Sequence, residues 1–284
     1  MVQLETQGKS ADTKRNVAKF LELLSRNADL DNPQEVLLFI SRHQCSNSMK
    51  ECLCYAYRRY CKYYKIDAKI PFYEHNSKPI HVPTKEKLIT IVTNASGALL
   101  TKLSISMETG VRPIELHTLK VKDVDVEQKL VYPTTAKHGA SRTLKISSTL
   151  ATMIQEHIVK HKLQPNDQLF KGTATQYGKN FRILRNRLAE KLHDPTLKTI
   201  RLYDFRHYFC TKKCYELKNP FVVMNLMGHK RLETTQIYMH LLNLEEGEWV
   251  CEGAQTKEQA IKLIEAGFQY VTSIEGIQLF KKRK

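Results

Sequence analysis

Four short segments between residues 109 and 238 combine side chains that can act on a phosphate ester. They are Thr109 to Leu116, the turn around Lys137, Tyr203 to Phe209, and Leu226 to Tyr238. Planar guanidinium groups, here Arg112 and Arg206, match the oxygens of a phosphate better than a point charge does. His229 follows a glycine and can donate a hydrogen bond to the same phosphate. We therefore expect these segments to form one site for phosphoryl transfer.

Tyr238 is the candidate nucleophile, and we expect Tyr208 and Tyr215 to serve in packing. A protein nucleophile keeps the energy of a cut phosphodiester in a covalent intermediate, so that another strand can be joined later. Ionising a tyrosine at pH 7 costs about 4 kcal/mol, because its pKa is about 10, and nearby cations or a proton acceptor must reduce that cost. Lys137 can protonate the leaving oxygen as a general acid, although turn lysines are commonly just solvated. No step needs a metal or a cofactor, and we expect none.

The surroundings of the two arginines also favour a phosphate site. We expect Asp204 to cap the N-terminus of a helix, which places Arg206 in its first turn. Free backbone N–H groups and the helix dipole favour an anion there. Glu115, three residues after Arg112, is expected to brace an arginine. A purely structural ion pair is the alternative for Arg112 with either Glu115 or Asp204.

The charge of the chain predicts a polyanionic partner. Its 284 residues include 45 Lys and Arg against 29 Asp and Glu, a net charge of +16, and such a bias favours nucleic acid. The excess lies mainly in residues 84–245 and is densest between Lys171 and Lys218. The candidate DNA contacts are Lys179, Arg182 and Arg185 in that run, and Arg58, Arg59 and Lys62 nearer the N-terminus. A solvated cationic helix face is an equally good explanation of each run.

Hydrophobic periodicity divides the chain into four parts that must position these residues. Residues 1–72 show helical stripes, such as Val17, Phe20, Leu21 and Leu24, and predict a helical DNA-binding domain. Residues 73–83 lack a period and contain prolines, which indicates a linker. Residues 84–245 predict a mostly helical catalytic domain with β-rich runs at 130–132 and 143–146. Residues 246–284 form a C-terminal tail, in which Thr256 to Lys284 predict a short helix and a hairpin through Glu275-Gly276. We expect a mainly α protein with a small antiparallel β-sheet and two domains.

The order and spacing of the four segments resemble the tyrosine recombinases, the family of phage lambda integrase, Cre and the Xer proteins. The resemblance covers residues 84–245, and the sequence from Glu265 onward is similar to the tails of archaeal integrases of mobile elements. It implies a site-specific DNA recombinase or integrase that cuts and rejoins strands through a 3′-phosphotyrosine at Tyr238, with a free 5′ hydroxyl. It also implies a clamp on double-stranded DNA with an inverted-repeat site, a dimer on each site and a tetrameric synapse. The tail would dock on a neighbouring protomer.

One position departs from the family pattern. Members usually have histidine three residues before the second arginine, where this chain has Tyr203. A phenol can donate and accept hydrogen bonds, but it does not shuttle protons near neutral pH as imidazole does. The proton acceptor of the reaction therefore stays open. We expect His207, directly after Arg206, to be a supporting hydrogen-bonding residue on another face of the helix.

Two alternative functions stay open as well. A topoisomerase-like nicking and closing enzyme would use the same chemistry without paired sites. A DNA-binding protein with this fold would have lost the chemistry through the change at Tyr203. No apolar run approaches the ~20 residues that cross a bilayer, and the first residues lack the apolar stretch of a secretory signal, so we expect a cytoplasmic protein without membrane contact. The cysteines lack the spacing of a structural zinc site, and we expect no metal.

Overall fold

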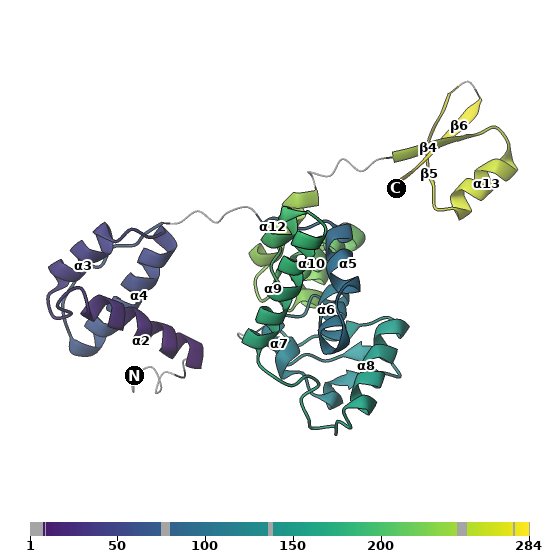
Figure 1. Cartoon of the computed structure of the whole chain (residues 1–284). Coiled ribbons are helices and arrows are strands. Elements are labelled where there is room, and N and C mark those ends of the chain that lie inside the picture. The colour runs from purple at the N-terminus through teal and green to yellow at the C-terminus, as the bar shows by residue number, and fades with distance from the viewer. Residues whose placement is uncertain are drawn as a thin grey trace. The chain divides into compact units, whose positions relative to one another are not determined.

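The computed structural model describes residues 8, 10–74, 80–135, 139–242, 249–274 and 276–283 (Figure 1). The chain separates into two compact units, residues 1–79 and residues 80–284. The described parts are mainly helical and contain two small antiparallel sheets of three strands each. The expected fold class is thus confirmed, with a second sheet of which we predicted only the C-terminal hairpin. Within the described ranges, no helix has the length and apolar character needed to cross a membrane.

The described residues of the first unit form a cluster of three helices. Its helices are α2 (Ala11–Ser25), α3 (Pro33–Arg42) and α4 (Asn47–Tyr64). Each begins with a side-chain cap, in which the oxygen of Ser10, Asn32 or Ser46 accepts a backbone N–H of the first turn. The apolar stripes of these helices meet in one core around Leu24, Ile40, Leu53 and Tyr57. The helical periodicity seen in the sequence is confirmed here.

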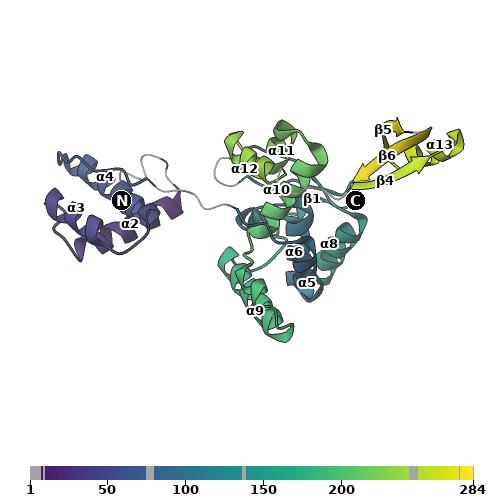
Figure 2. The same cartoon turned by 90° about the horizontal axis from the view of Figure 1, so that it is seen from above.

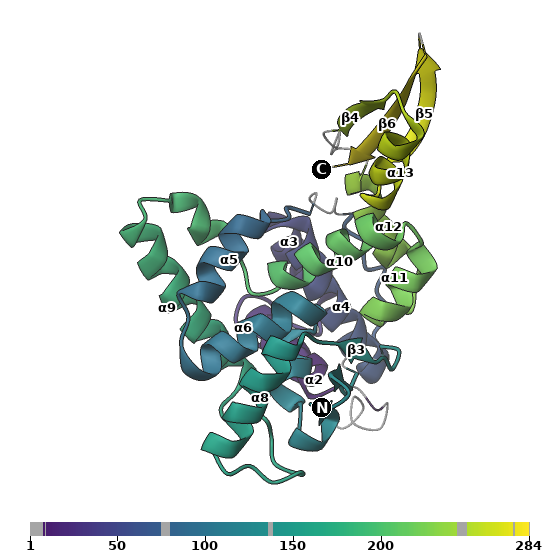
Figure 3. The same ribbon diagram turned by 90° about the vertical axis from the view of Figure 1, so that its right-hand side faces the viewer.

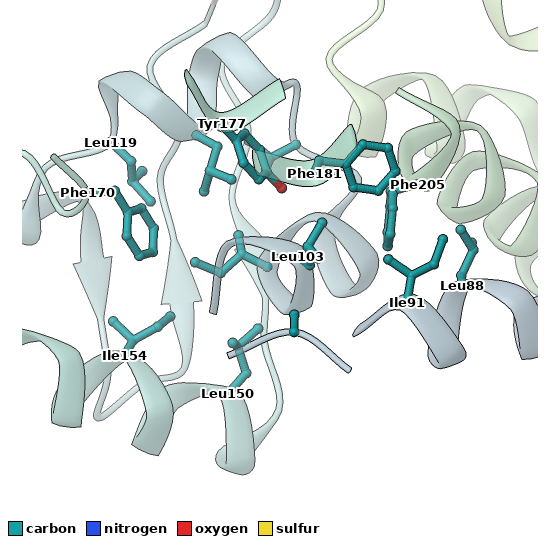
Figure 4. Close-up of a cluster of buried hydrophobic side chains, with 14 of the residues drawn as sticks. Leu88, Ile91, Leu103, Leu119, Leu150, Ile154, Phe170, Tyr177, Phe181 and Phe205 are labelled. Atoms are coloured by element: carbon teal, nitrogen blue, oxygen red, sulfur yellow. The ribbon is translucent and has the colours of Figure 1, made fainter. Parts of the chain in front are cut away.

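The second unit has a core built on helix α6 (Gly97–Thr109), which packs against its neighbours α5 and α8 (Figure 3). The other elements of this core are α5 (Lys85–Thr93), α7 (Pro113–Thr118), the 3-10 helices η1 (Val121–Asp123) and η2 (Pro195–Thr199), α8 (Ser148–Lys160) and α9 (Ala174–Lys191). Leu103 of α6 lies in the middle of the buried cluster, among Ile91, Leu150, Phe181 and Phe205 (Figure 4). Helix α6 ends at Gly110, whose φ of 60° is left-handed.

The first sheet lies between α7 and α8 in the chain. Its strands are β1 (Val124–Asp125), β2 (Leu130–Val131) and β3 (Leu144–Lys145), paired in the order β1-β2-β3. Val131 faces Leu144 in the register of β2 and β3, and both side chains are buried. The β-rich runs predicted from the sequence are therefore confirmed, and the connection between β2 and β3 carries residue 137.

Three further helices form a second cluster in this unit (Figure 2). They are α10 (Asp204–Leu217), α11 (Pro220–Met227) and α12 (Glu233–Leu242). Their shared core contains Phe209, Cys210, Val223, Met227 and Tyr238. Sequence reasoning predicted a helix at the position of α10 but missed α11, although Asn219 and Pro220 stand at its start as Asn32 and Pro33 stand at the start of α3.

The C-terminal residues form the second sheet and one helix. The elements are β4 (Trp249–Ala254), α13 (Lys257–Glu265), β5 (Gln269–Ile274) and β6 (Ile277–Arg283), and the strand order is β4-β6-β5. Phe280 of β6 is buried against Ala254 and Ala260. The predicted helix and hairpin are confirmed, with Gly276 at the turn at a φ of 80° and Glu275 outside the described residues. Strand β4, which pairs along the whole of β6, was not predicted.

Candidate active site

One buried carboxylate holds two arginines at the start of α7. Arg112 precedes Pro113, its backbone N–H donates to Glu115 Oε2 at 3.0 Å, and its Nη1 donates to Glu115 Oε1 at 2.6 Å. Arg142 Nη2 also donates to Glu115 Oε2, at 2.5 Å. Glu115 is fully buried, which alone would raise its pKa, but the hydrogen bonds and charges of Arg142 and Arg112 outweigh burial and lower the pKa to about 2. The carboxylate is therefore ionised and fixes both guanidinium groups.

Arg206 is the largest of the fully buried side chains, with 1% of its surface exposed. Its Nη1 donates to the carbonyl oxygen of Gly110 at 2.7 Å, and its Nη2 donates to that of Met227 at 2.6 Å. Burial and the charge of Arg112 lower its pKa to about 10. Since Gly110 lies two residues before Arg112 and Met227 two residues before His229, Arg206 ties together the two loops that carry them. A guanidinium has five N–H donors, and these two bonds leave three for other acceptors.

The start of α10 differs from the sequence prediction. The residue at the N-cap position is Tyr203, in a right-handed conformation and without a side-chain cap bond, and Asp204 is the first residue of the helix. The Asp204 carboxylate accepts the backbone N–H of Arg201 at 2.7 Å and pairs with its guanidinium. The prediction that Asp204 caps the helix was wrong, because the carboxylate bonds back to the preceding turn. Arg206 still lies in the first turn of the helix.

His229 lies next to these arginines. It follows Gly228, which ends α11 at a φ of 63°. A Cβ at Gly228 would lie 2.8 Å from Arg142 Nη1, so the turn before His229 packs directly on Arg142. The Nδ1 atom of His229 is 2.9 Å from Thr235 Oγ1. Burial, followed by the charges of Arg206, Arg112 and Arg142, lowers the pKa of His229 to about 4, so its imidazole is neutral at physiological pH.

Tyr238, on α12, is 4% exposed. Its hydroxyl is 2.7 Å from Nδ1 of His207, the residue after Arg206 on α10. Burial raises its pKa well above the ordinary value, and the charge of Arg206 opposes that rise. His207, expected only as a supporting residue on another face of the helix, thus contacts the candidate nucleophile directly.

The remaining candidates differ in how the structure places them. Lys137 lies outside the described residues. Tyr203 is 41% exposed, and its ring packs edge-on against His207 with ring centroids 5.1 Å apart. The described part of the chain contains no group of three or more His, Cys, Asp or Glu side chains that could hold a metal ion.

The predicted DNA-contacting residues fall into two kinds. Lys62 on α4, and Lys179 and Arg182 on α9, are exposed. The others have partners within their own unit: Arg58 pairs with Glu51 and donates to the Pro71 carbonyl, Arg59 lies over the ring of Tyr55, and Arg185 donates to the Ile200 carbonyl. Arg58 and Arg185 thus also hold their own unit together.

Sequence reasoning missed two residues of this site, Arg142 and Thr235. Arg142 is 9% exposed and forms an ion pair with a carboxylate 27 residues earlier in the chain. Arg142 lies five residues after Lys137, in the same connection between β-rich runs, and this proximity in the sequence could have identified it as a site residue. Thr235 is fully buried beside His229, and no sequence signal separates it from the adjacent Thr234.

Comparison with known proteins identifies the family. Residues 83–245 match the Phage integrase family. The chain therefore belongs to the phage integrase family, the tyrosine recombinases. It is 29% identical over 189 residues to a protein named tyrosine recombinase XerA of Saccharolobus solfataricus, a match that covers 66% of this chain and 61% of that protein. XerA of Pyrococcus horikoshii is 23% identical over 255 residues, with 83% and 85% covered.

The match spans about three fifths of the length of the Saccharolobus protein. It spans about half of the length of a further relative, a tyrosine recombinase of Pseudothermotoga lettingae. Two solved structures have a similar fold. The Tn1549 transposon integrase in complex with transposon right end DNA gives a TM-score of 0.64 at 18% identity, covering 93% of this chain and 96% of that one. A lambda integrase dimer bound to a COC′ core site gives 0.63 at 11% identity, covering 83% and 91%.

Proposed function

We propose that this chain is a site-specific DNA recombinase that cuts and rejoins strands through a 3′-phosphotyrosine intermediate at Tyr238. The observation that carries this proposal is the pair of hydrogen bonds from Arg206 to the Gly110 and Met227 carbonyls. These bonds hold the segments that carry Arg112 and His229 at one guanidinium. The next residue in the sequence after Arg206 is His207, whose Nδ1 contacts the Tyr238 hydroxyl. The charge of Arg206 also acts on the Tyr238 phenol, which supports a shared role for the two side chains.

In this proposal the arginines bind the scissile phosphate. Negative charge develops on the oxygens of the phosphate during attack, and guanidinium groups fixed in advance stabilise it without reorganisation. Arg112 is held by Glu115, and the three remaining N–H donors of Arg206 supply the second fork. The neutral imidazole of His229, bonded to Thr235, adds a hydrogen-bond donor.

Tyr238 then attacks phosphorus and displaces the 5′ oxygen, which takes a proton from Lys137 as general acid. Reversal of the step by the 5′ hydroxyl of another strand completes exchange. Because one phosphodiester is replaced by another, the reaction is close to neutral in energy and needs no nucleotide cofactor.

The rest of the chain supplies DNA contact and assembly in this proposal. Residues 1–72 form a DNA-binding domain, 73–83 a linker, 84–245 the catalytic domain and 246–284 a tail that docks on a neighbouring protomer. The exposed Lys62, Lys179 and Arg182 contact the sugar-phosphate backbone, with Arg58, Arg59 and Arg185 beside them. Two protomers bind each inverted-repeat site, and four form the synapse.

The test is covalent trapping on nicked duplexes that carry candidate inverted-repeat sites. A nick next to the scissile position lets the short 5′ product diffuse away, so that the adduct accumulates and can be counted on a denaturing gel. We expect an adduct with the wild type and with Tyr215→Phe, and none with Tyr238→Phe, which should still bind DNA. An adduct that persists in Tyr238→Phe would refute the nucleophile. Relaxation of plasmids without an inverted repeat at an equal rate would instead identify a nicking and closing enzyme.

A further inference from the structure

The proton of the Tyr238 phenol must leave before or during attack, and the surroundings of the hydroxyl make this difficult. The side chain is packed among Cys210, Val223 and Met227 and is 4% exposed. Burial disfavours the phenolate, because a charged oxygen loses the stabilisation that water provides. An acceptor in contact with the hydroxyl is therefore required. The structure places His207 Nδ1 2.7 Å from it, which is within the reach of direct proton transfer.

We propose that His207 is the general base that accepts the proton of Tyr238, a role that rests on the strand-cutting function proposed above. The imidazole is one residue along α10 from Arg206, so base and phosphate-binding group are positioned by the same helical turn. Tyr203, at the position where the family usually has histidine, packs its ring against His207 and orients the imidazole. This chain thus has a proton acceptor although the usual one is replaced by a phenol.

The electrostatic surroundings of His207 suit an acceptor. Burial lowers its pKa; the carboxylate of Asp204 on the same helix opposes this, and the charges of Arg201 and Arg206 add to it. The rings of Tyr203, which precedes α10, and of Tyr238 on α12 also contact the imidazole. The imidazole is therefore neutral at physiological pH. With the proton on Nε2, its Nδ1 lone pair accepts the hydrogen bond from the phenol, a tautomer assigned from this contact.

The step balances without any further reactant. The Tyr238 Oη–phosphorus bond forms while the bond from phosphorus to the 5′ oxygen breaks, and the phenolic proton moves to His207 Nδ1 to give an imidazolium. The 5′ oxygen takes its proton from the general acid. In the joining step a 5′ hydroxyl attacks phosphorus and gives its proton to the general acid, which had lost one in the cutting step. The bond from phosphorus to Tyr238 Oη breaks, and the imidazolium returns the proton to the phenolate oxygen. His207 ends each cycle neutral.

The test compares His207→Gln and His207→Ala with the wild type in single-turnover formation of the covalent adduct on a nicked duplex. Glutamine can accept the hydrogen bond of the phenol but cannot take its proton, so it separates positioning from proton transfer. We expect adduct formation to slow by about 100-fold or more in both variants at pH 7, the usual size of general base catalysis. His161→Gln is the matched control, an exposed histidine directly after α8 that receives the same substitution. It should react at the wild-type rate.

The pH dependence provides a readout that a structural role would not change. The wild-type rate should rise tenfold per pH unit at acid pH and level off once His207 is neutral. In His207→Gln the rate should keep rising to pH 9, because hydroxide replaces the imidazole, and the deficit should shrink accordingly. Free imidazole should restore part of the rate of His207→Ala, in which a ring-sized space lies beside the phenol.

Each contrary result has a distinct meaning. If His207→Gln reacts at the wild-type rate with the wild-type pH profile, His207 is not the base, while the strand-cutting function stands. If glutamine restores the rate that alanine loses, and imidazole has no effect, His207 only positions the phenol and the inference is overturned. If the wild type forms no adduct on any site that it binds, both the function and the inference fail. Gel shifts and thermal unfolding of each variant exclude loss of binding or of fold as the cause.

Discussion

Glu115→Gln tests whether one buried carboxylate organises the phosphate-binding groups. The substitution keeps the shape of the side chain and removes its charge, leaving the guanidinium groups of Arg112 and Arg142 without a counter-ion. The side chains of Arg112 and Arg142, counted without their backbone, are 15% and 2% exposed, respectively. Breaking a buried ion pair by removing one partner costs about 3–5 kcal/mol. The shift in the Glu115 pKa from 4.5 to about 2 corresponds to about 3 kcal/mol, which is consistent with that range.

The pH dependence of this loss follows from the direction of the shift. Because the carboxylate is more acidic in the folded protein, it stabilises the fold above about pH 4.5, and this stabilisation is lost as the pH falls toward 2. Glu115→Gln should therefore lower the free energy of unfolding by about 3 kcal/mol at pH 7, and by clearly less at pH 3. It should also abolish adduct formation, since Arg112 is no longer held.

Hydrogen-exchange mass spectrometry in increasing urea measures the free energy of unfolding in peptides from residues 97–118. These peptides belong to the second unit, which contains Glu115, so the value is not affected by unfolding of the first unit. Glu156→Gln, on the exposed side of α8, is the control and should leave the value unchanged. An equal free energy of unfolding for Glu115→Gln and the wild type at pH 7 would refute the reasoning, because it would mean that the two arginines do not need the carboxylate.

Three other predictions concern the turn before His229, its imidazole, and the DNA contact. Gly228→Ala adds a Cβ 2.8 Å from Arg142 Nη1 at a φ of 63°. Gly97→Ala is the control, because Gly97 has a similar φ of 54° but no atom close to the added Cβ. Only Gly228→Ala should lower thermal stability by clearly more than the ~1 kcal/mol that backbone strain costs. The ring of His229 should stay neutral in an NMR titration down to about pH 5. The stability of the fold should be lost as the pH falls from 6.5 toward 4, because the unfolded chain takes up the proton first. Protonation of His229 near pH 6.5 would contradict its burial among arginines. Lys62→Ala should reduce the slope of log affinity against log salt by about 0.9 in fluorescence anisotropy, and an unchanged slope would place Lys62 outside the DNA interface.

Local signals in the sequence predicted much of the fold. Asn32 and Pro33 mark the start of α3, Gly110 marks the end of α6, and Arg112 stands before Pro113 where α7 begins. Such signals act over a few residues and are readable from the chain alone. Helix α11 was missed because Phe221 to Met227 are almost all apolar and show no amphipathic period.

The partners of the site residues were not predictable in the same way. The contacts between Glu115 and Arg142, and between His207 and Tyr238, join residues 27 and 31 positions apart. The first depends on how α7 lies against the connection between β2 and β3, and the second on how α10 and α12 pack. The spacing of residues determines neither. The position of His207 after Arg206 was visible in the sequence, but the direction of its imidazole was not. Long-range packing therefore decides which residues contact the candidate nucleophile.

The proposed strand-cutting mechanism depends most directly on the identity of the residue that becomes linked to DNA. Nuclease digestion of the trapped adduct, followed by peptide mass spectrometry, measures this identity. We predict a nucleotide attached through its 3′ phosphate to the peptide that contains Tyr238, together with a free 5′ hydroxyl on the released strand. A nucleotide on any other residue, or a 5′-phosphate linkage, would contradict the account.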